Sequence, residues 1–339
     1  MKTRVVRFHE LGGPEVLRIE TLDLAAPGAG EVLVHMEAIG LNRAEAAFRQ
    51  GHYFEPPQLP ARIGYEGAGR VEALGPGVAG YAAGDAVCII PGFSMNRYGV
   101  YAERAIVPAS ALLPRPPGMS ATDGAAIWMP LLTAYGALID ITGLGPGEAV
   151  LITAASSSVG LAAIEIANAV GATPIAVTRG TSKVAALKQA GAAHVITSDT
   201  QDIAAETARI TGGRGARLAF DPIGGPIVAD LAAALAPRGT LILYGNLSGK
   251  ARETMFPYGP ALAKGLSMRG YLVFELIHDA GRFAAARAFI EEGIRSGSLA
   301  PTIARTFDFD QMVDAHRFLE SGEQFGKIVV TVPPASPGR

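Results

Sequence analysis

The chain has little cysteine and little charge, and each shortage removes a class of function. A single cysteine, Cys88, occurs among 339 residues, so the chain can form neither an internal disulfide nor a four-cysteine zinc site. Charged residues make up 18% of the sequence, the net charge is -2 and no segment is rich in lysine or arginine. Because nucleic-acid phosphates require a basic face, we expect no nucleic-acid partner.

Long apolar runs are also missing. A membrane-spanning helix needs about 18 or more apolar residues in succession, and no window of that length is apolar throughout, so we expect no membrane partner. The N-terminal residues MKTRVVRFHE lead directly into a strand-like pattern and contain no apolar core of a signal peptide. We therefore expect a cytoplasmic protein.

Apolar residues and turn formers are abundant. Hydrophobic residues make up 49% of the chain, and 42 glycines and 23 prolines lie between the apolar segments. A chain of this length is expected to form two domains. We predict one domain from residues 1–125 with 276–339, and a second from residues 126–275.

The two predicted domains differ in their patterns. Short strand-like runs between Gly and Pro clusters fill the first domain and predict a mostly antiparallel, barrel-like sheet with one helix near 42–49. A helical segment over 121–142 joins the two parts. From residue 148 strands alternate with helices, and six such strands predict a doubly wound parallel sheet. A final strand at 327–332 is predicted to return to the first domain.

The stretch Glu148–Thr178 has the pattern of a dinucleotide-binding unit. Val150–Thr153 reads as a buried strand, Ala154–Gly160 consists mainly of small residues, and Leu161–Val170 is an apolar helix. A second strand follows within about thirty residues of the first. This strand–turn–helix–strand order is the one that binds a dinucleotide.

The turn of this unit departs from the glycine-rich fingerprint. Ala155, Ser157 and Gly160 occupy the three glycine positions of G-x-G-x-x-G. A helix N-terminus carries unpaired N–H groups and partial positive charge, and it binds a pyrophosphate where small side chains allow close approach. Ser157 adds a hydroxyl that could donate to phosphate. The alternative interpretation is an ordinary strand-to-helix turn.

The residues after the second strand favour NADP(H) over NAD(H). A site for NAD usually has an acidic residue there to bind the ribose hydroxyls, whereas this chain has Thr178, Arg179 and Lys183. Cations and hydroxyls suit the 2′-phosphate of NADP(H), which an arginine grips with its planar fork. Alternatively, Lys183 is a solvated residue at the start of the next helix.

Motifs along nearly the whole chain resemble the medium-chain dehydrogenase/reductase superfamily, in its zinc-independent quinone oxidoreductase branch. The order and spacing of these motifs carry the resemblance: Gly40-Leu41-Asn42, Gly51-His52-Tyr53, Gly64-Tyr65-Glu66-Gly67-Ala68-Gly69, Gly84-Asp85-Ala86-Val87, Tyr101-Ala102-Glu103, Leu132-Thr133-Ala134-Tyr135, the AASSSVG turn, Val177-Thr178-Arg179 and Gly326-Lys327-Ile328-Val329. Ser157 and Ser158 replace two glycines that are usual in this turn of the family.

The resemblance implies an α/β protein with a GroES-like β-barrel domain and a Rossmann domain that binds NADP(H). It also implies a homodimer and a small-molecule substrate: a quinone, or the activated carbon–carbon double bond of an enone, alkenal or enoyl thioester. We expect cofactor contacts from Thr133, Ser156, Ser157, Ser158, Val159, Gly160, Thr178, Arg179, Lys183, Gly245, Asn246, Phe274 and Lys327.

No zinc is expected. Catalytic zinc needs about three Cys, His or carboxylate ligands. Zinc-dependent relatives have a His in the Gly-His-Glu segment, where this chain has Tyr65, and their first Cys ligand falls near Asn42. The loop 91–100 contains no cysteine.

Without a metal, hydrogen bonds must stabilise the charge that builds on the conjugated oxygen during hydride transfer. Tyr53 and Asn42 are the candidate catalytic donors, although Asn42 could instead cap the helix that follows it. Tyr53, Tyr65 and Thr133 are the candidate substrate-binding residues. Tyr65 and Thr133 also fit a core position and a helix-interior hydroxyl, respectively.

Three functions remain open. The leading one is an NADPH-dependent reductase of quinones or activated double bonds. The second is an enoyl thioester reductase of fatty-acid or polyketide synthesis. A dinucleotide-binding scaffold or redox sensor is the non-enzymatic alternative, since a fold does not determine a function.

Overall fold

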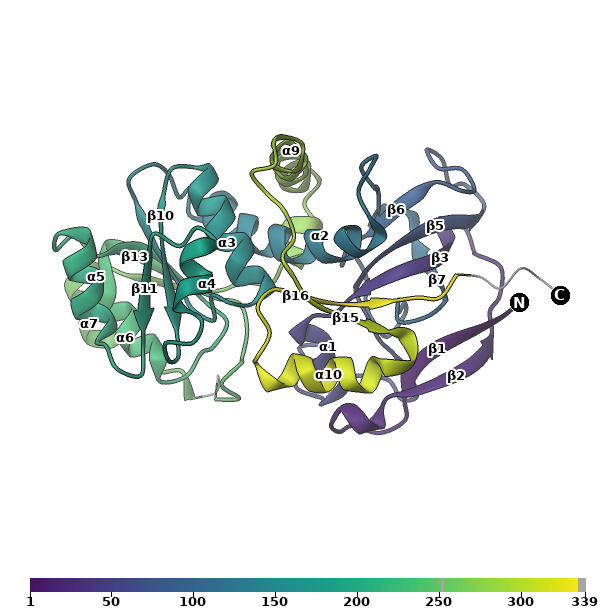
Figure 1. Cartoon of the computed structure of the whole chain (residues 1–339), viewed down its shortest axis with the longest axis horizontal. Coiled ribbons are helices and arrows are strands. Elements are labelled where there is room, and N and C mark those ends of the chain that lie inside the picture. Colours follow the sequence, from purple (N-terminus) through teal and green to yellow (C-terminus); the bar gives the residue numbers. More distant parts are fainter. Residues whose placement is uncertain (251–252, 335–339) are drawn as a thin grey trace. The chain divides into compact units, whose positions relative to one another are not determined.

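The computed structural model describes residues 1–250 and 253–334 (Figure 1). The chain divides into two compact units, residues 1–129 with 301–339 and residues 130–300.

The first unit is built on two sheets. One is three-stranded, in the order β2-β1-β4, and the other seven-stranded, in the order β15-β16-β3-β5-β6-β8 with β7 paired to β3. All pairs are antiparallel except β15 with β16. The strands are β1 (Lys2–Phe8), β2 (Arg18–Asp23), β3 (Glu31–Gly40), β4 (Ala61–Arg62), β5 (Glu66–Leu74), β6 (Ala86–Ile89), β7 (Arg104–Pro108), β8 (Leu112–Pro114), β15 (Ile303–Asp308) and β16 (Lys327–Thr331).

The last strand returns to the first sheet, as its sequence predicts. Strand β16 pairs antiparallel with the end of β3. Helices α1 (Arg43–Arg49) and α10 (Met312–Ser321) belong to this unit. At the end of β3 a Cβ on Gly40 would lie 1.9 Å from the carbonyl oxygen of Ala125. Only glycine therefore allows this close approach of strand and helix.

The second unit contains a six-stranded parallel sheet in the order β11-β10-β9-β12-β13-β14. The sequence predicts a doubly wound parallel sheet of six strands, and the structure adds their order. The strands are β9 (Ala149–Ile152), β10 (Thr173–Thr178), β11 (His194–Thr197), β12 (Ala216–Asp221), β13 (Leu235–Leu243) and β14 (Ser267–Gly270). The helices are α3 (Ser158–Ala169), α4 (Val184–Gln189), α5 (Ile203–Thr211), α6 (Ile227–Ala234), α7 (Tyr258–Lys264), α8 (Phe274–Ile277) and α9 (Ala280–Ser296).

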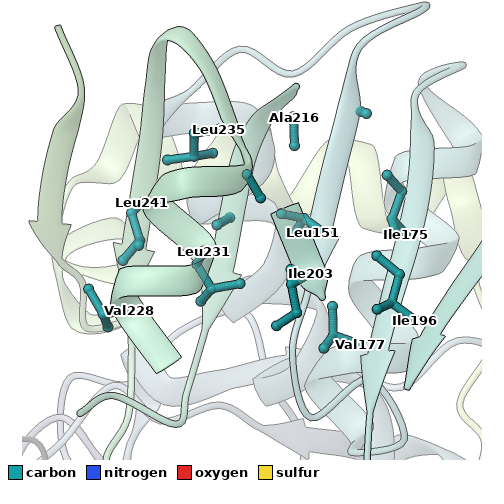
Figure 2. Close-up of a cluster of buried hydrophobic side chains, with 13 residues drawn as sticks. Leu151, Ile175, Val177, Ile196, Ile203, Ala216, Val228, Leu231, Leu235 and Leu241 are labelled. Carbon is teal, nitrogen blue, oxygen red and sulfur yellow. The ribbon is translucent and has the colours of Figure 1, made fainter. Parts of the chain in front are cut away.

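One core of the second unit forms between this sheet and its helices. Figure 2 shows Leu151 of β9, Ile175 of β10 and Leu231 of α6 among its side chains, all of them fully buried. Truncating such a side chain to alanine typically costs about 2–5 kcal/mol. Burial of these apolar faces holds the carboxyl ends of the strands in register.

The helical segment near 121–142 is two elements. Helix α2 (Ala121–Tyr135) continues as a π-helix over Gly136–Ile141. Within the described residues, this is the one helix that is long and apolar enough to span a membrane, and 83% of its most apolar window is buried inside the protein. That burial is the property of a core helix.

The boundary between the units differs from the predicted one at its C-terminal side. We predicted that residues 276–300 belong to the first domain, but they group with the second unit. The contacts of α9 explain this. Arg282 pairs with Asp140 of the π-helix, and the Phe289 ring lies 5.2 Å from that of Tyr135. Helices α7 and α8 were not predicted.

Candidate active site

The turn between β9 and α3 is shaped by a small residue and a helix cap. The N–H of Gly160 donates to the Ser157 hydroxyl oxygen at 3.1 Å, so Ser157 is the N-cap of α3. A Cβ on Gly160 would lie 2.6 Å from the carbonyl oxygen of Ala155. Glycine is thus required at the third fingerprint position, and the serine at the second position stabilises the helix start.

A lysine in the segment between β10 and α4 contacts the turn between β9 and α3. The Lys183 ammonium donates to the Ser156 hydroxyl at 3.0 Å, although the two residues are 27 positions apart. Strands β9 and β10 are parallel neighbours, so their carboxyl ends lie at one edge of the sheet. Thr178 is half-buried at the end of β10, and Arg179 beyond it is exposed. A cation and a hydroxyl beside a helix N-terminus can bind a phosphate.

Two other strand ends complete this edge. Asp221 at the end of β12 is buried and accepts hydrogen bonds from the hydroxyl of Thr153, which follows β9, and from the N–H of Gly224 at 2.8 Å. Burial raises the pKa of the Asp221 carboxyl. Gly245 follows β13, where a Cβ would lie 2.8 Å from the Pro222 carbonyl oxygen, and Asn246 after it is exposed.

Asp221 was missed in the sequence analysis. An acidic residue that ends a buried strand and precedes a proline was the sequence signal available for it. The residues Ser158 and Val159 form the first turn of α3, where N–H groups have no acceptor within the helix.

Thr133 and Phe274 lie on segments that contact each other. Thr133 is 8% exposed on α2. The Tyr271 hydroxyl donates to the carbonyl of Leu132 at 3.4 Å, and a Cβ on Gly136 would lie 1.9 Å from that hydroxyl oxygen. Phe274 begins α8 three residues after Tyr271 and is half-buried. The Tyr271 side chain therefore joins the segment of Phe274 to that of Thr133, and both residues are predicted to contact the cofactor.

In the first unit Tyr53 lies within a group of aromatic rings. Its ring centroid is 6.2 Å from that of Tyr65 and 6.3 Å from that of Phe48. Burial raises the pKa of Tyr53 well above its ordinary value, while the Tyr65 hydroxyl acts in the opposite direction. The phenol of Tyr53 is therefore a hydrogen-bond donor at every physiological pH. Tyr65 is fully buried and packs on Phe93 at 5.7 Å, which is the core position that the sequence analysis left open.

Asn42 and Lys327 meet in a buried polar network. The Lys327 ammonium donates to the Asn42 side-chain oxygen at 2.6 Å and to the Glu66 carboxylate. The Asn42 amide donates to the carbonyl of Gly40 at 3.3 Å and to Glu45 at 3.2 Å. Both amide hydrogens of Asn42 are thus in use within the protein, and Lys327 is only 1% exposed.

Glu45 is the second carboxyl group of this network. It closes a capping box with Asn42 and also accepts the N–H of Tyr65 at 3.2 Å. Burial raises its pKa to about 7, against the opposing effect of the Lys327 charge. The spacing Asn42-x-x-Glu45 could have predicted the capping box, but no local pattern indicates Lys327, which is 285 positions from Asn42.

Among the described residues no group of three or more His, Cys, Asp or Glu side chains could hold a metal ion. Tyr65 and Asn42, which stand where zinc-dependent relatives have ligands, are used in packing and in the buried network. The residues present therefore do not fit a zinc site.

Comparison with known proteins agrees with this arrangement. Residues 28–117 match the family model described as alcohol dehydrogenase GroES-like domain, and residues 158–292 match that described as zinc-binding dehydrogenase. The chain is 30% identical to the human synaptic vesicle membrane protein VAT-1 homolog, over 95% of this chain and 85% of that protein. It is 29% identical to a 2-haloacrylate reductase of Burkholderia sp, over 95% of this chain and 97% of that protein.

Solved structures show the same fold. Escherichia coli quinone oxidoreductase complexed with NADPH has a TM-score of 0.90 at 29% identity, covering 97% of this chain and 99% of that one. An NAD-dependent alcohol dehydrogenase has a TM-score of 0.87 at 32% identity, covering 97% of this chain and all of that one. The CurF ER cyclopropanase from the curacin A biosynthetic pathway has a TM-score of 0.85 at 27% identity, covering 98% and 99%.

A GroES-like unit joined to a doubly wound parallel sheet with a small-residue turn defines an oxidoreductase that uses a nicotinamide dinucleotide. The chain belongs to the medium-chain dehydrogenase/reductase superfamily, in its zinc-independent quinone oxidoreductase-like branch.

Proposed function

We propose that the protein is an NADPH-dependent reductase of quinones or of activated carbon–carbon double bonds. The observation that carries the proposal is the contact of Lys183 with Ser156 beside the start of α3. A cation and a hydroxyl beside a helix N-terminus are groups to which a phosphorylated dinucleotide would bind. The printed names of the relatives, a 2-haloacrylate reductase and an NADPH-bound quinone oxidoreductase, support the same chemistry.

The residues present fit the cofactor. Lys183, Ser156, Thr178 and Arg179 would hold the adenosine 2′-phosphate and its ribose, and the first-turn N–H groups of α3 would face the pyrophosphate. The remainder of the dinucleotide would contact residues that follow β13 or lie on α2 and α8: Gly245, Asn246, Thr133 and Phe274. Bound NADPH supplies the hydride that the reaction requires.

Tyr53 would supply the hydrogen bond that the reaction needs in place of a metal. Its raised pKa keeps the phenol protonated, so it can donate to the oxygen on which negative charge builds. One such donor is worth about 3 kcal/mol of barrier. Asn42 and Lys327 would act indirectly in this proposal, because their polar hydrogens face the buried network that holds the start of α1.

An enoyl thioester reductase remains the second candidate. Its substrate also places developing charge on a carbonyl oxygen, and the likeness to the CurF ER structure supports it. Activity on crotonyl-CoA that exceeds activity on small enones and quinones would favour this candidate.

The test is a substrate panel with purified protein. We expect NADPH to be oxidised in the presence of 1,4-naphthoquinone or an enone, at a rate that a metal chelator leaves unchanged. Tyr53→Phe should lower kcat by about 100-fold and leave NADPH affinity within twofold. Tight NADPH binding without turnover of any substrate would refute the enzymatic proposal and favour the scaffold alternative.

We also propose, from the family alone, a cytoplasmic homodimer, which sedimentation and fractionation would test.

A further inference from the structure

The loop that carries Tyr53 has little backbone support of its own. The N–H groups of Gly51 and His52 still bond to carbonyls of α1. Within the described residues, Tyr53 and residues 55–58 make no backbone–backbone hydrogen bond. The next regular pairing is that of Ala61 in β4 with β1. Side chains must therefore hold this segment in place.

The neighbouring segment, residues 93–98, is firmly anchored. Phe93, Met95 and Tyr98 are buried, and the Met95 sulfur accepts the N–H of Gly64 at 3.4 Å. The residues between them, Ser94 and Asn96, are half-buried. Two hydrogen-bonding side chains of this segment are therefore outside its buried apolar group.

Those two side chains bind the Tyr53 loop. The Asn96 amide donates to the Pro56 carbonyl at 2.9 Å and to the Glu55 carboxylate at 3.0 Å, while its oxygen accepts the N–H of Gln58 at 2.7 Å. The Ser94 hydroxyl donates to the same Glu55 oxygen and accepts the N–H of Asn96. Glu55, Ser94 and Asn96 are called the loop clamp below.

The clamp holds a residue that lies close to Tyr53. Residues 53–55 form a bend, in which the rings of Tyr53 and Phe54 lie 4.4 Å apart. Glu55 is half-buried two residues after Tyr53, and its charge is near enough to the phenol to help raise the pKa of Tyr53. Fixing Glu55 therefore restricts the bend that carries the Tyr53 ring.

We propose that Asn96 is a positioning residue that, through the loop clamp, fixes the Tyr53 hydroxyl for the reaction. The proposal rests on the function proposed above, because Tyr53 is the donor there. Asn96 itself touches neither substrate nor cofactor in this role. A small displacement of a catalytic group is enough to lower a rate by orders of magnitude.

Limited digestion by chymotrypsin tests the clamp without reference to activity. The protease cuts after aromatic residues, and Phe54 is 58% exposed while Tyr258, on another unit, is 71% exposed. Fragment masses separate cleavage at the two sites, so Tyr258 is an internal reference. Loss of three hydrogen bonds in Asn96→Ala should raise cleavage at Phe54 about tenfold relative to Tyr258. Unchanged relative cleavage would overturn the proposal.

A double-mutant cycle with Tyr53→Phe tests the catalytic part. Asn96→Ala should lower kcat/KM for 1,4-naphthoquinone about tenfold in the wild-type background and less than twofold in the Tyr53→Phe background. NADPH affinity should not change. Equal losses in both backgrounds would show that Asn96 does not act through Tyr53, and would overturn this proposal while the proposed function stands. A wild-type chain without any reductase activity would overturn both.

Two further variants supply rescue and control. Asn96→Asp places a carboxylate against Glu55 and should behave like Asn96→Ala. Adding Glu55→Gln restores the bond between residues 55 and 96 but not the bond to the Pro56 carbonyl, so it should recover part of the rate and of the resistance to cleavage. Asn168→Ala removes an amide that donates to the Gly191 carbonyl at 3.0 Å in the second unit, and it should change neither measurement. Failure of the rescue with a folded double variant would contradict the clamp geometry.

Discussion

Replacement of Lys183 by alanine should weaken NADPH binding and spare NADH binding. The ammonium lies 3.0 Å from the Ser156 hydroxyl, beside the turn that precedes α3. In the proposed complex it faces a 2′-phosphate, a group that NADH lacks. The variant therefore removes a charge that only one of the two cofactors can use.

The size of the expected loss in NADPH affinity follows from the exposure of the Lys183 side chain. A hydrogen bond to a charged group contributes about 1.5–3 kcal/mol when it is well formed. Lys183 is half-buried, so solvent and salt screen the interaction and the lower end of the range applies. About 1.4 kcal/mol corresponds to a tenfold change in Kd for NADPH, and the Kd for NADH should stay within twofold.

Fluorescence titration of the reduced cofactors measures both constants. Lys188→Ala is the matched control, because Lys188 is an exposed lysine in the last turn of the same helix, α4. The NADPH effect should shrink as salt rises from 50 to 500 mM, concentrations chosen to shorten the Debye length from roughly 14 to 4 Å. If Lys183→Ala bound NADPH and NADH with the wild-type constants, the charge-based argument for NADP(H) would be refuted.

Three further changes test other parts of the structure. Gly160→Ala forces a Cβ against the Ala155 carbonyl oxygen, so it should lower stability by about 1–3 kcal/mol, seen as a lower Tm; a wild-type Tm would contradict the contact. Lys327→Met leaves the buried Glu66 carboxylate without its cation and should cost about 3–5 kcal/mol in denaturant unfolding, much of it recovered by adding Glu66→Gln. His316 is fully buried, its ring nitrogens have no hydrogen-bond partner among the described residues, and burial lowers its pKa from 6.5 to about 3. The unfolded chain binds the imidazole proton more tightly than the folded chain does. The contribution of neutral His316 to the free energy of unfolding is therefore complete above pH 6.5 and falls by about 1.4 kcal/mol per pH unit below that. The free energy of unfolding of a His316→Phe variant should depend less steeply on pH, and an equal slope would refute this assignment.

The sequence allowed the second unit to be predicted in detail because its determinants are local. Apolar β-branched runs, the small-residue turn at 154–160 and the glycine after the helix each act within a few residues, and the alternation of strands and helices predicts a parallel, doubly wound sheet. The requirement for glycine at position 160 was visible in the same way. From the sequence we expect the Ser157 hydroxyl to donate to a phosphate; we did not predict that the oxygen of this hydroxyl caps α3.

Contacts between distant segments could not be predicted. Lys183 reaches Ser156 only because β10 lies beside β9, and α9 joins the second unit through an ion pair with Asp140. Asn42 was a candidate donor to substrate; the spacing to Glu45 indicates a capping box, but nothing near Asn42 in the sequence shows that Lys327 would bind its side-chain oxygen. Such assignments depend on the folded arrangement and not on periodicity.

The buried network also includes helix α2, next to the proline inside it. Pro130 lacks an N–H, so the helix loses one of its backbone hydrogen bonds there. One residue earlier, the N–H of Met129 donates to the Glu66 carboxylate at 2.8 Å. A carboxylate buried there needs a cation, and the ammonium of Lys327 supplies it from β16. Lys327 in turn fixes the Asn42 amide. The start of α1, the middle of α2 and the last strand are therefore tied to one charge pair, so a change at any of them should alter the segment that leads to Tyr53.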